Sequence, residues 1–141
     1  ARFQHAKNVL GDEQHMGPAT QLFLGLLRSA RWIGVLQDIF RVKNLIPDPL
    51  MVGSGIHNTV FGGHLGLHVD FNWNKELQLH RRLNIFVYLN RDWRPTYGGH
   101  LELWNRNLTR YRQILPSFGR VVGFASTDFS YHGHPHPLTA P

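Results

Sequence analysis

Hydrophobic and polar residues follow two different patterns along the chain, and the change comes near residue 50. From Pro18 onward, apolar residues recur at the three- and four-residue spacing of an amphipathic helix. Pro18 suits the first turn of such a helix, and Ser29 suits the N-cap of a second segment. The pattern predicts one broken helix or two short ones over residues 18–42, ending before the two prolines of IPDP at 46–49.

Beyond residue 50, glycines separate short runs that are typical of β-strands. Residues 1–17 are polar, and we expect a loosely ordered lead-in there. The chain is thus predicted to be mainly β with N-terminal helices (α+β). We expect a single domain over residues 1–141, with helical support over 1–50 and a sandwich or barrel over 51–141. The predicted strands cover roughly residues 55–61, 64–71, 82–90, 100–105, 119–126 and 129–134.

The segment RLNIFVYLN at residues 82–90 has two different faces, because alternate residues of a strand point to opposite sides. One face is purely aliphatic and needs a hydrophobic cover such as the N-terminal helices. It consists of Leu83, Ile85, Val87 and Leu89. The other face is polar and aromatic, which is typical of a binding cavity, with a solvent-exposed face as the alternative. It consists of Arg82, Asn84, Phe86 and Tyr88.

His68 and Asp70 stand two residues apart in GGHLGLHVDFNWN at residues 62–74, so a strand would project both side chains to one side. Burying such a pair is costly unless a positive group lies between them. Two histidines and one carboxylate on one face of an iron ion leave its opposite positions open. Such a site needs a second histidine from a distant strand. The stretch FSYHGHPHPL offers three candidates: His132, His134 and His136.

The composition limits the classes of partner that the chain is expected to bind. Its formal net charge is +6, but its twelve arginines are scattered, so nucleic-acid binding in a basic groove is not expected. The absence of cysteine excludes a disulfide framework and thiolate metal sites, and it fits a reducing, cytoplasmic location. No apolar run has the length of a membrane span, so we expect no membrane partner.

From about residue 45 to its end, the chain resembles the Fe(II)/2-oxoglutarate-dependent dioxygenases of the prolyl 4-hydroxylase-like group. The family's fold is a double-stranded β-helix, a cupin-like jelly roll backed by helices. This agrees with helices followed by short strands that have one aliphatic face. The matching pieces are LIPDP (45–49), GGHLGLHVDFN (62–72), RRLNIFVYLNRDW (81–93), YGGHLELW (97–104), GRVVGF (119–124) and STDFSYHGHPHPL (126–138).

The resemblance implies that His68, Asp70 and His132 bind iron. His132 is preferred because the family's ligand precedes the glycine of an HG pair; His134 is its rival on the same strand face. His136, between two prolines, is expected in a loop. No catalytic residue is expected beyond the metal ligands.

The tyrosine of the YLN motif often contacts 2-oxoglutarate in relatives, which implies this role for Tyr88. Asn84 and Arg82 share its strand face and are further candidates for binding the cosubstrate. A guanidinium pairs well with a carboxylate, so Arg82 is the reserve candidate for the distal carboxylate, with a structural salt bridge as the alternative.

The resemblance further implies a hydroxylase that uses Fe(II), 2-oxoglutarate and O2, with ascorbate as an optional reductant, and releases succinate and CO2. The expected substrate is a small molecule or a peptide: a prolyl residue, an amino acid or a sugar unit. Relatives carry a basic residue on the strand after the HG motif. This chain ends at Pro141, before that strand, so we expect a C-terminal truncation that removes the last strand.

Three alternatives remain at this stage. The first is a non-catalytic jelly-roll module that binds metal without turnover. The second is a nucleic-acid-binding or base-repair protein, which the scattered arginines disfavour. The third is a zinc hydrolase, which the lack of an HExxH motif disfavours.

Overall fold

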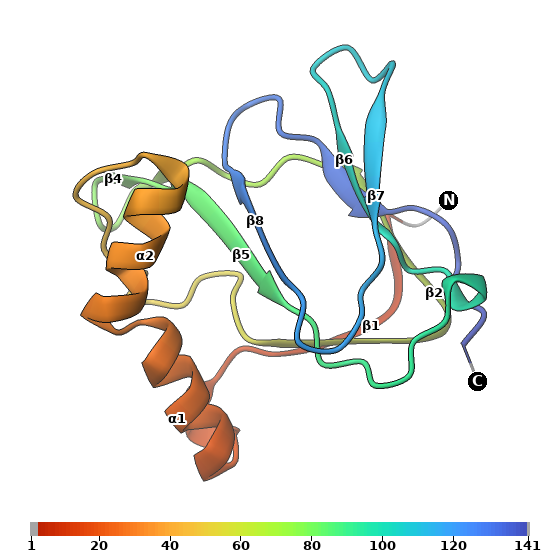
Figure 1. The fold of residues 1–141 in the computed structure, drawn as a ribbon, viewed down its shortest axis with the longest axis horizontal. Helices are drawn as coiled ribbons and strands as arrows, with labels where there is room; N and C mark the ends of the chain where they lie inside the picture. Colours follow the sequence, from red (N-terminus) through yellow and green to blue (C-terminus); the bar gives the residue numbers. More distant parts are fainter. Residues whose placement is uncertain (1–2, 141) are drawn as a thin grey trace. The chain divides into compact units, whose positions relative to one another are not determined.

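A computed structural model describes residues 3–140 of the chain, and these residues form two compact units (Figure 1). One unit holds the start of the chain up to Lys7 together with the segment from Thr59 onward. The other is the intervening segment, Asn8–Asn58. No helix among the described residues is long and apolar enough to cross a membrane. The organisation as one domain with a change near residue 50 stays a prediction.

Two short helices lie in the unit Asn8–Asn58, as the apolar spacing predicted. α1 (Pro18–Leu27) begins at its proline, and α2 (Ala30–Phe40) follows directly after Ser29. Ser29 caps α2, because its hydroxyl accepts a hydrogen bond from the Trp32 N–H at 3.3 Å. Arg41 then adopts the left-handed conformation, with φ of 53°, and ends the helix before the prolines of IPDP.

The N-terminal lead-in is more ordered than the sequence predicted, because it contains β1 (Gln4–Leu10). Residues 1 and 2 of that lead-in lie outside the described residues. β1 stands at the edge of a sheet beside β2 (Ile56–His68). Next to β1, the Phe3 carbonyl accepts a hydrogen bond from Gly66 N–H at 2.8 Å. The prediction was wrong here because a strand paired with a distant partner needs no apolar alternation of its own.

The strands form one five-stranded sheet in the order β1–β2–β9–β6–β7 and two strand pairs, β5–β8 and β3–β4. The pairs β2–β9, β6–β9, β6–β7, β5–β8 and β3–β4 are antiparallel. The molecule is therefore mainly β with two α-helices, as predicted. The other strands are β3 (Trp73–Asn74), β4 (Leu79–His80), β5 (Leu83–Val87), β6 (Leu101–Trp104), β7 (Tyr111–Ile114), β8 (Val121–Ala125) and β9 (His132–His134), and the 3-10 helices are η1 (Glu13–His15) and η2 (Pro95–Tyr97).

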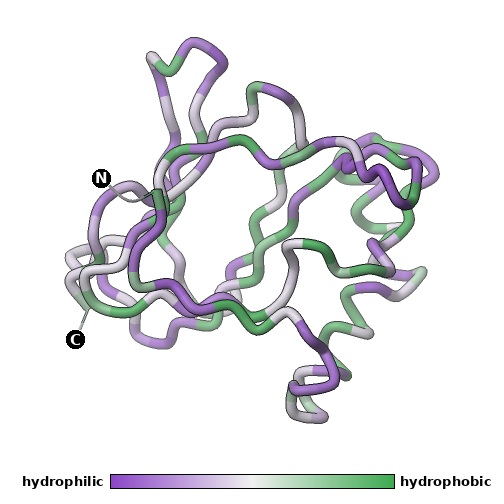
Figure 2. Tube along the Cα trace, turned by 180° about the vertical axis from the view of Figure 1, so that it is seen from behind, coloured by the Kyte–Doolittle hydropathy of each residue, from purple (hydrophilic) through white to green (hydrophobic). Residues whose placement is uncertain are grey.

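Several strand predictions need correction, and β3 and β4 lie outside the predicted ranges. The runs 55–61 and 64–71 belong to one strand, β2, which ends at His68. β7 lies outside the predicted strand ranges, because its sequence, YRQI, is mostly polar. It forms through a hairpin with β6 that Figure 2 shows as largely hydrophilic. The Asn105 side chain holds this turn, because it accepts hydrogen bonds from the N–H groups of Thr109 and Arg110 at 2.9 and 3.1 Å.

The strand pair β5–β8 lies against the five-stranded sheet through aromatic rings. Asn84 on β5 stands opposite Phe124 on β8. The Phe124 ring centre lies 4.6 Å from that of His132 on β9 and 5.6 Å from that of Phe86. The polar and aromatic face predicted for residues 82–90 therefore turns toward β9 at Asn84 and Phe86. That the helices cover the opposite, aliphatic face stays a prediction.

Candidate metal centre

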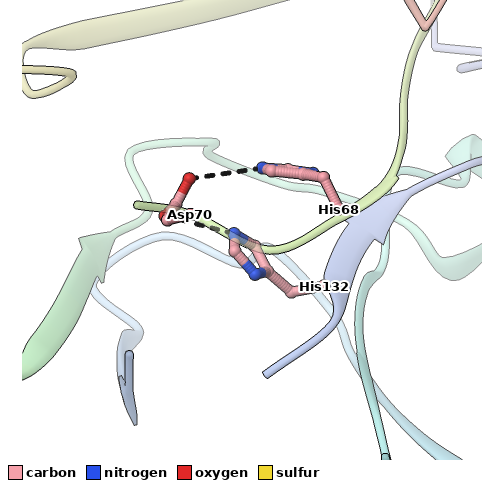
Figure 3. Close-up of side chains that lie close together, drawn as sticks. All are labelled: His68, Asp70 and His132. Atoms are coloured by element: carbon pink, nitrogen blue, oxygen red, sulfur yellow. Dashed lines mark ion pairs between the residues drawn. The ribbon is translucent and has the colours of Figure 1, made fainter. Parts of the chain in front are cut away.

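Two paired strands bring the predicted metal-binding residues together. His68 is the last residue of β2, His132 is the first of β9, and the two face each other in the antiparallel register after a bulge in β2. Asp70 follows two residues after His68 and points toward both imidazoles (Figure 3). Each of the three side chains offers one ligand atom, and these atoms all lie within 4.8 Å of one another. The three predicted residues therefore converge.

The donor atoms in this triad are close to the spacing that a common ion requires. His68 Nε2 lies 3.5 Å from Asp70 Oδ1, and His132 Nε2 lies 3.5 Å from Asp70 Oδ2. Donor atoms about 2.1 Å from one metal ion and at right angles to each other are about 3 Å apart. Small adjustments of the side chains would bring all three donors to one ion.

Both histidines are held in the tautomer that a metal ion needs. His68 Nδ1 bonds to the carbonyl of Gly66 at 2.9 Å, and His132 Nδ1 bonds to the carbonyl of Ser130 at 3.0 Å. A carbonyl can only accept, so each Nδ1 carries the hydrogen. The lone pair of each Nε2 is then free and faces Asp70. A backbone carbonyl in this position is a common way to orient an imidazole that binds metal.

Electrostatics favour the protonation states that suit metal binding at Asp70 and His132, whereas His68 is shifted toward its protonated form. The facing His68 imidazole holds the pKa of Asp70 well below its usual range, against the effect of burial, and Arg81, His132 and Asn84 add to this. Burial lowers the pKa of His132, which favours its neutral form. For His68 burial also lowers the pKa, but bonds to Asp70 and the Gly66 carbonyl outweigh it, so the net pKa is raised.

Asn84 and Arg81 surround the carboxylate of Asp70. Asn84, only 3% exposed, donates from Nδ2 to Asp70 Oδ2 at 2.7 Å. The Arg81 guanidinium donates to Asn84 Oδ1, and its Nη2 lies 3.6 Å from Asp70 Oδ2. Sequence reasoning missed Arg81, because it took the strand alternation to begin at Arg82. β5 begins only at Leu83, so neither Arg81 nor Arg82 belongs to the alternating residues of this strand.

Lys7 is a second cation near the triad that the sequence did not reveal. It lies on β1, half-buried, and burial lowers its pKa while the charge of Asp70 opposes this effect. The charge of Lys7 also acts to lower the pKa values of His68 and His134. A segment predicted as a loose lead-in gave no signal that one of its residues would approach Asp70.

The other predicted residues lie in different settings. Tyr88 follows β5 and is half-buried, and burial raises its pKa to about 12, so its phenol is neutral at ordinary pH. Arg82 has an exposed side chain. His134 lies on β9, where burial, Lys7 and two histidines lower its pKa to about 4. Among the described residues, the group spaced to hold a metal contains His132 and not His134. His136 follows β9 in a loop.

A comparison with known families agrees with this geometry. Residues 54–140 match the sequence profile of the 2OG-Fe(II) oxygenase superfamily. The match covers more than half of the chain and includes all three residues of the triad. No curated protein matches the chain.

Proposed function

Because the chain belongs to the 2OG-Fe(II) oxygenase superfamily, we propose that it is an Fe(II)- and 2-oxoglutarate-dependent dioxygenase that hydroxylates a C–H bond. The observation that carries this proposal is the convergence of His68, Asp70 and His132 within the matched segment. Two imidazoles and one carboxylate form the donor set of such iron sites. Membership of the prolyl 4-hydroxylase-like group rests on the resemblance of the motifs from LIPDP to STDFSYHGHPHPL.

We also propose that the β-rich unit is a jelly roll. Its support is the contact between the five-stranded sheet and the β5–β8 pair. The triad lies where these two layers meet, because Asp70 bonds to Asn84 on β5 and His132 packs on Phe124 on β8.

The protein's own contribution to the reaction is to hold the ion on one side and leave its other side open. A bound iron ion would activate O2, of which one oxygen atom converts C–H to C–OH and the other enters succinate as 2-oxoglutarate is oxidised with loss of CO2. His68, Asp70 and His132 act as ligands in this scheme, not as acids or bases. The carbonyl bonds at Nδ1 of the two histidines would leave the Nε2 lone pairs available to a bound ion.

The proposed cosubstrate contacts are Tyr88, Arg82 and Asn84. A neutral phenol at Tyr88 can donate a hydrogen bond to a carboxylate, and its raised pKa of about 12 keeps it neutral. The exposed Arg82 side chain is free to turn toward a distal carboxylate. Lys7 and Arg81 add positive charge near Asp70, which favours a dianionic cosubstrate.

For the substrate we propose a small molecule or a peptide, with a prolyl residue, an amino acid or a sugar unit as the hydroxylated group. The net charge of +6 also suits an anionic substrate. O2 is the second cosubstrate, and ascorbate is an optional reductant.

The first test is an anaerobic titration of the full chain with Fe(II) and then with 2-oxoglutarate. A visible charge-transfer band is expected in the parent and absent in Asp70→Ala. No band in the parent would contradict the proposal. A band without succinate formation under air, over a panel of peptides, amino acids and sugars, would identify a metal-binding module without turnover.

A further inference from the structure

The two oxygens of Asp70 lie in different surroundings. Oδ2 accepts a hydrogen bond from Asn84 Nδ2 at 2.7 Å and lies 3.6 Å from Arg81 Nη2. Oδ1 lies 3.5 Å from His68 Nε2, and Oδ2 lies at the same distance from His132 Nε2. The two oxygens therefore differ in the Asn84 amide and the Arg81 charge, which both lie at Oδ2. A hydrogen bond and a nearby positive charge both withdraw electron density from an oxygen, so Oδ1 is the stronger metal donor of the two.

The orientation of the Asn84 amide is determined by its two neighbours. Arg81 can only donate, so the oxygen of the amide faces Arg81 and the NH2 group faces Asp70. The hydrogen bonds therefore run in one direction, from Arg81 to Asn84 to Asp70. A buried amide that bonds at both ends cannot turn over without losing both bonds.

Arg81 and Asn84 are themselves held in place. The Arg81 N–H donates to the Asn72 carbonyl at 2.9 Å, and its guanidinium lies 4.9 Å from the centre of the Phe71 ring. Asn84 stands opposite Phe124, whose ring packs on His132. One rung of the β5–β8 ladder thus supports two of the three candidate ligands, Asp70 through Asn84 and His132 through Phe124.

We propose that Asn84 and Arg81 are positioning residues that hold Asp70 Oδ2, so that Asp70 binds the metal through Oδ1 alone. The inference rests on the proposed function. A six-coordinate ion with two imidazoles and one carboxylate oxygen keeps three open positions, whereas a carboxylate that bound through both oxygens would leave two. Two positions are enough for a bidentate cosubstrate but leave none for oxygen. Asn84 and Arg81 would therefore keep one position open.

This role differs from the cosubstrate contact proposed for Asn84 above, and metal binding without cosubstrate separates the two. A residue that only contacts 2-oxoglutarate leaves the affinity for the metal alone unchanged. A residue that positions a ligand changes both the metal affinity and the ligand field. Partners of metal ligands typically change metal affinity by roughly 10- to 100-fold when they are mutated.

The experiment is an anaerobic titration of the full chain with Co(II), with visible absorption as the readout, because its intensity depends on coordination number. Asn84→Ala is expected to weaken Co(II) binding about tenfold and to change the spectrum. Arg81→Gln is expected to act in the same direction but more weakly, and Arg81→Lys to recover part of the affinity. The matched controls are Asn90→Ala, which removes an amide bonded to the Pro116 carbonyl at 2.8 Å, and Arg112→Gln on the exposed β7.

The outcomes separate this inference from the proposed function. If the parent binds neither Co(II) nor Fe(II), the proposed function fails and the positioning role with it. If the parent binds but both Asn84→Ala and Arg81→Gln match it in affinity and spectrum, the positioning role is overturned while the proposed function stands. Arg81→Gln also covers the case in which Asn84→Ala does not fold, since the Arg81 side chain is less deeply buried.

Discussion

Asp70 and Glu102 are two carboxylates with a histidine beside them, yet only one of them lies at a candidate site. Glu102 on β6 is 2% exposed, and both its oxygens accept hydrogen bonds, from Trp104 Nε1 at 2.8 Å and Gln113 Nε2 at 3.1 Å. The nearby histidine, His136, is 3.8 Å away and largely exposed. At Asp70, by contrast, two imidazole nitrogens with free lone pairs face the carboxylate.

The difference shows that burial of a carboxylate near a histidine does not by itself identify a metal centre. Glu102 has its hydrogen-bonding capacity used by neutral donors on its own sheet. At Asp70, one ligand atom from each of two histidines and the carboxylate lies close to the other two. The convergence of two imidazoles on one carboxylate is therefore the feature that distinguishes the candidate site.

The largest expected effect is the loss of metal binding in Asp70→Ala. Removing the only carboxylate of the triad leaves two neutral imidazoles, and Fe(II) affinity should fall by roughly 100-fold or more. Glu102→Gln is the matched control and should bind Fe(II) within a few-fold of the parent. Anaerobic Fe(II) titration measures both variants. Equal losses in the two would remove the distinction between the carboxylates.

The next effect separates the two histidines of the HGH strand. His132→Ala should weaken Fe(II) binding by roughly 100-fold, because it removes a donor of the triad. His134→Ala should change it by less than about threefold, because His134 lies outside that group. The same titration decides between them. The reverse order would move the third ligand to His134.

The two carboxylates should rank in the opposite order in their effect on folding stability. Glu102→Ala leaves the N–H groups of Trp104 and Gln113 without their acceptor and should lower the free energy of unfolding by about 1–3 kcal/mol. Urea denaturation of the metal-free protein measures this. Asp70→Ala, measured in the same way, tests whether the triad contributes to stability without metal. We expect a smaller loss there, because Asp70 lies at a partly exposed site.

The sequence predicted those parts of the molecule that depend on local chemistry. Pro18 and Ser29 marked the starts of both helices, and the spacing of His68 and Asp70, with His132 later in the chain, indicated the triad. β1 and β7 could not be predicted in this way, because strand pairing supplies their hydrogen bonds and their own residues are polar. For the same reason, nothing in the sequence indicated that Lys7 would approach Asp70.

Tyr88 gives the smallest expected effect and a test of pH dependence. Tyr88→Phe removes one proposed hydrogen bond to 2-oxoglutarate and should weaken cosubstrate binding roughly three- to tenfold, with Fe(II) affinity unchanged. Because burial raises the pKa of Tyr88 to about 12, the parent's 2-oxoglutarate affinity should not change through this group between pH 7 and pH 9.5. Titration of the charge-transfer band measures the 2-oxoglutarate affinity of the variant and the pH dependence of this affinity in the parent.

The raised pKa also fixes the sign of the stability change at high pH. The phenol ionises near pH 10 in the unfolded chain and near pH 12 in the folded one. Burial of the neutral phenol therefore contributes its full stability below about pH 10, and this contribution is lost as the pH rises toward 12. Tyrosinate absorbance at 295 nm should show a late phase that is missing in Tyr88→Phe. A parent without that phase would place Tyr88 in contact with water, as the strand alternation alone allowed.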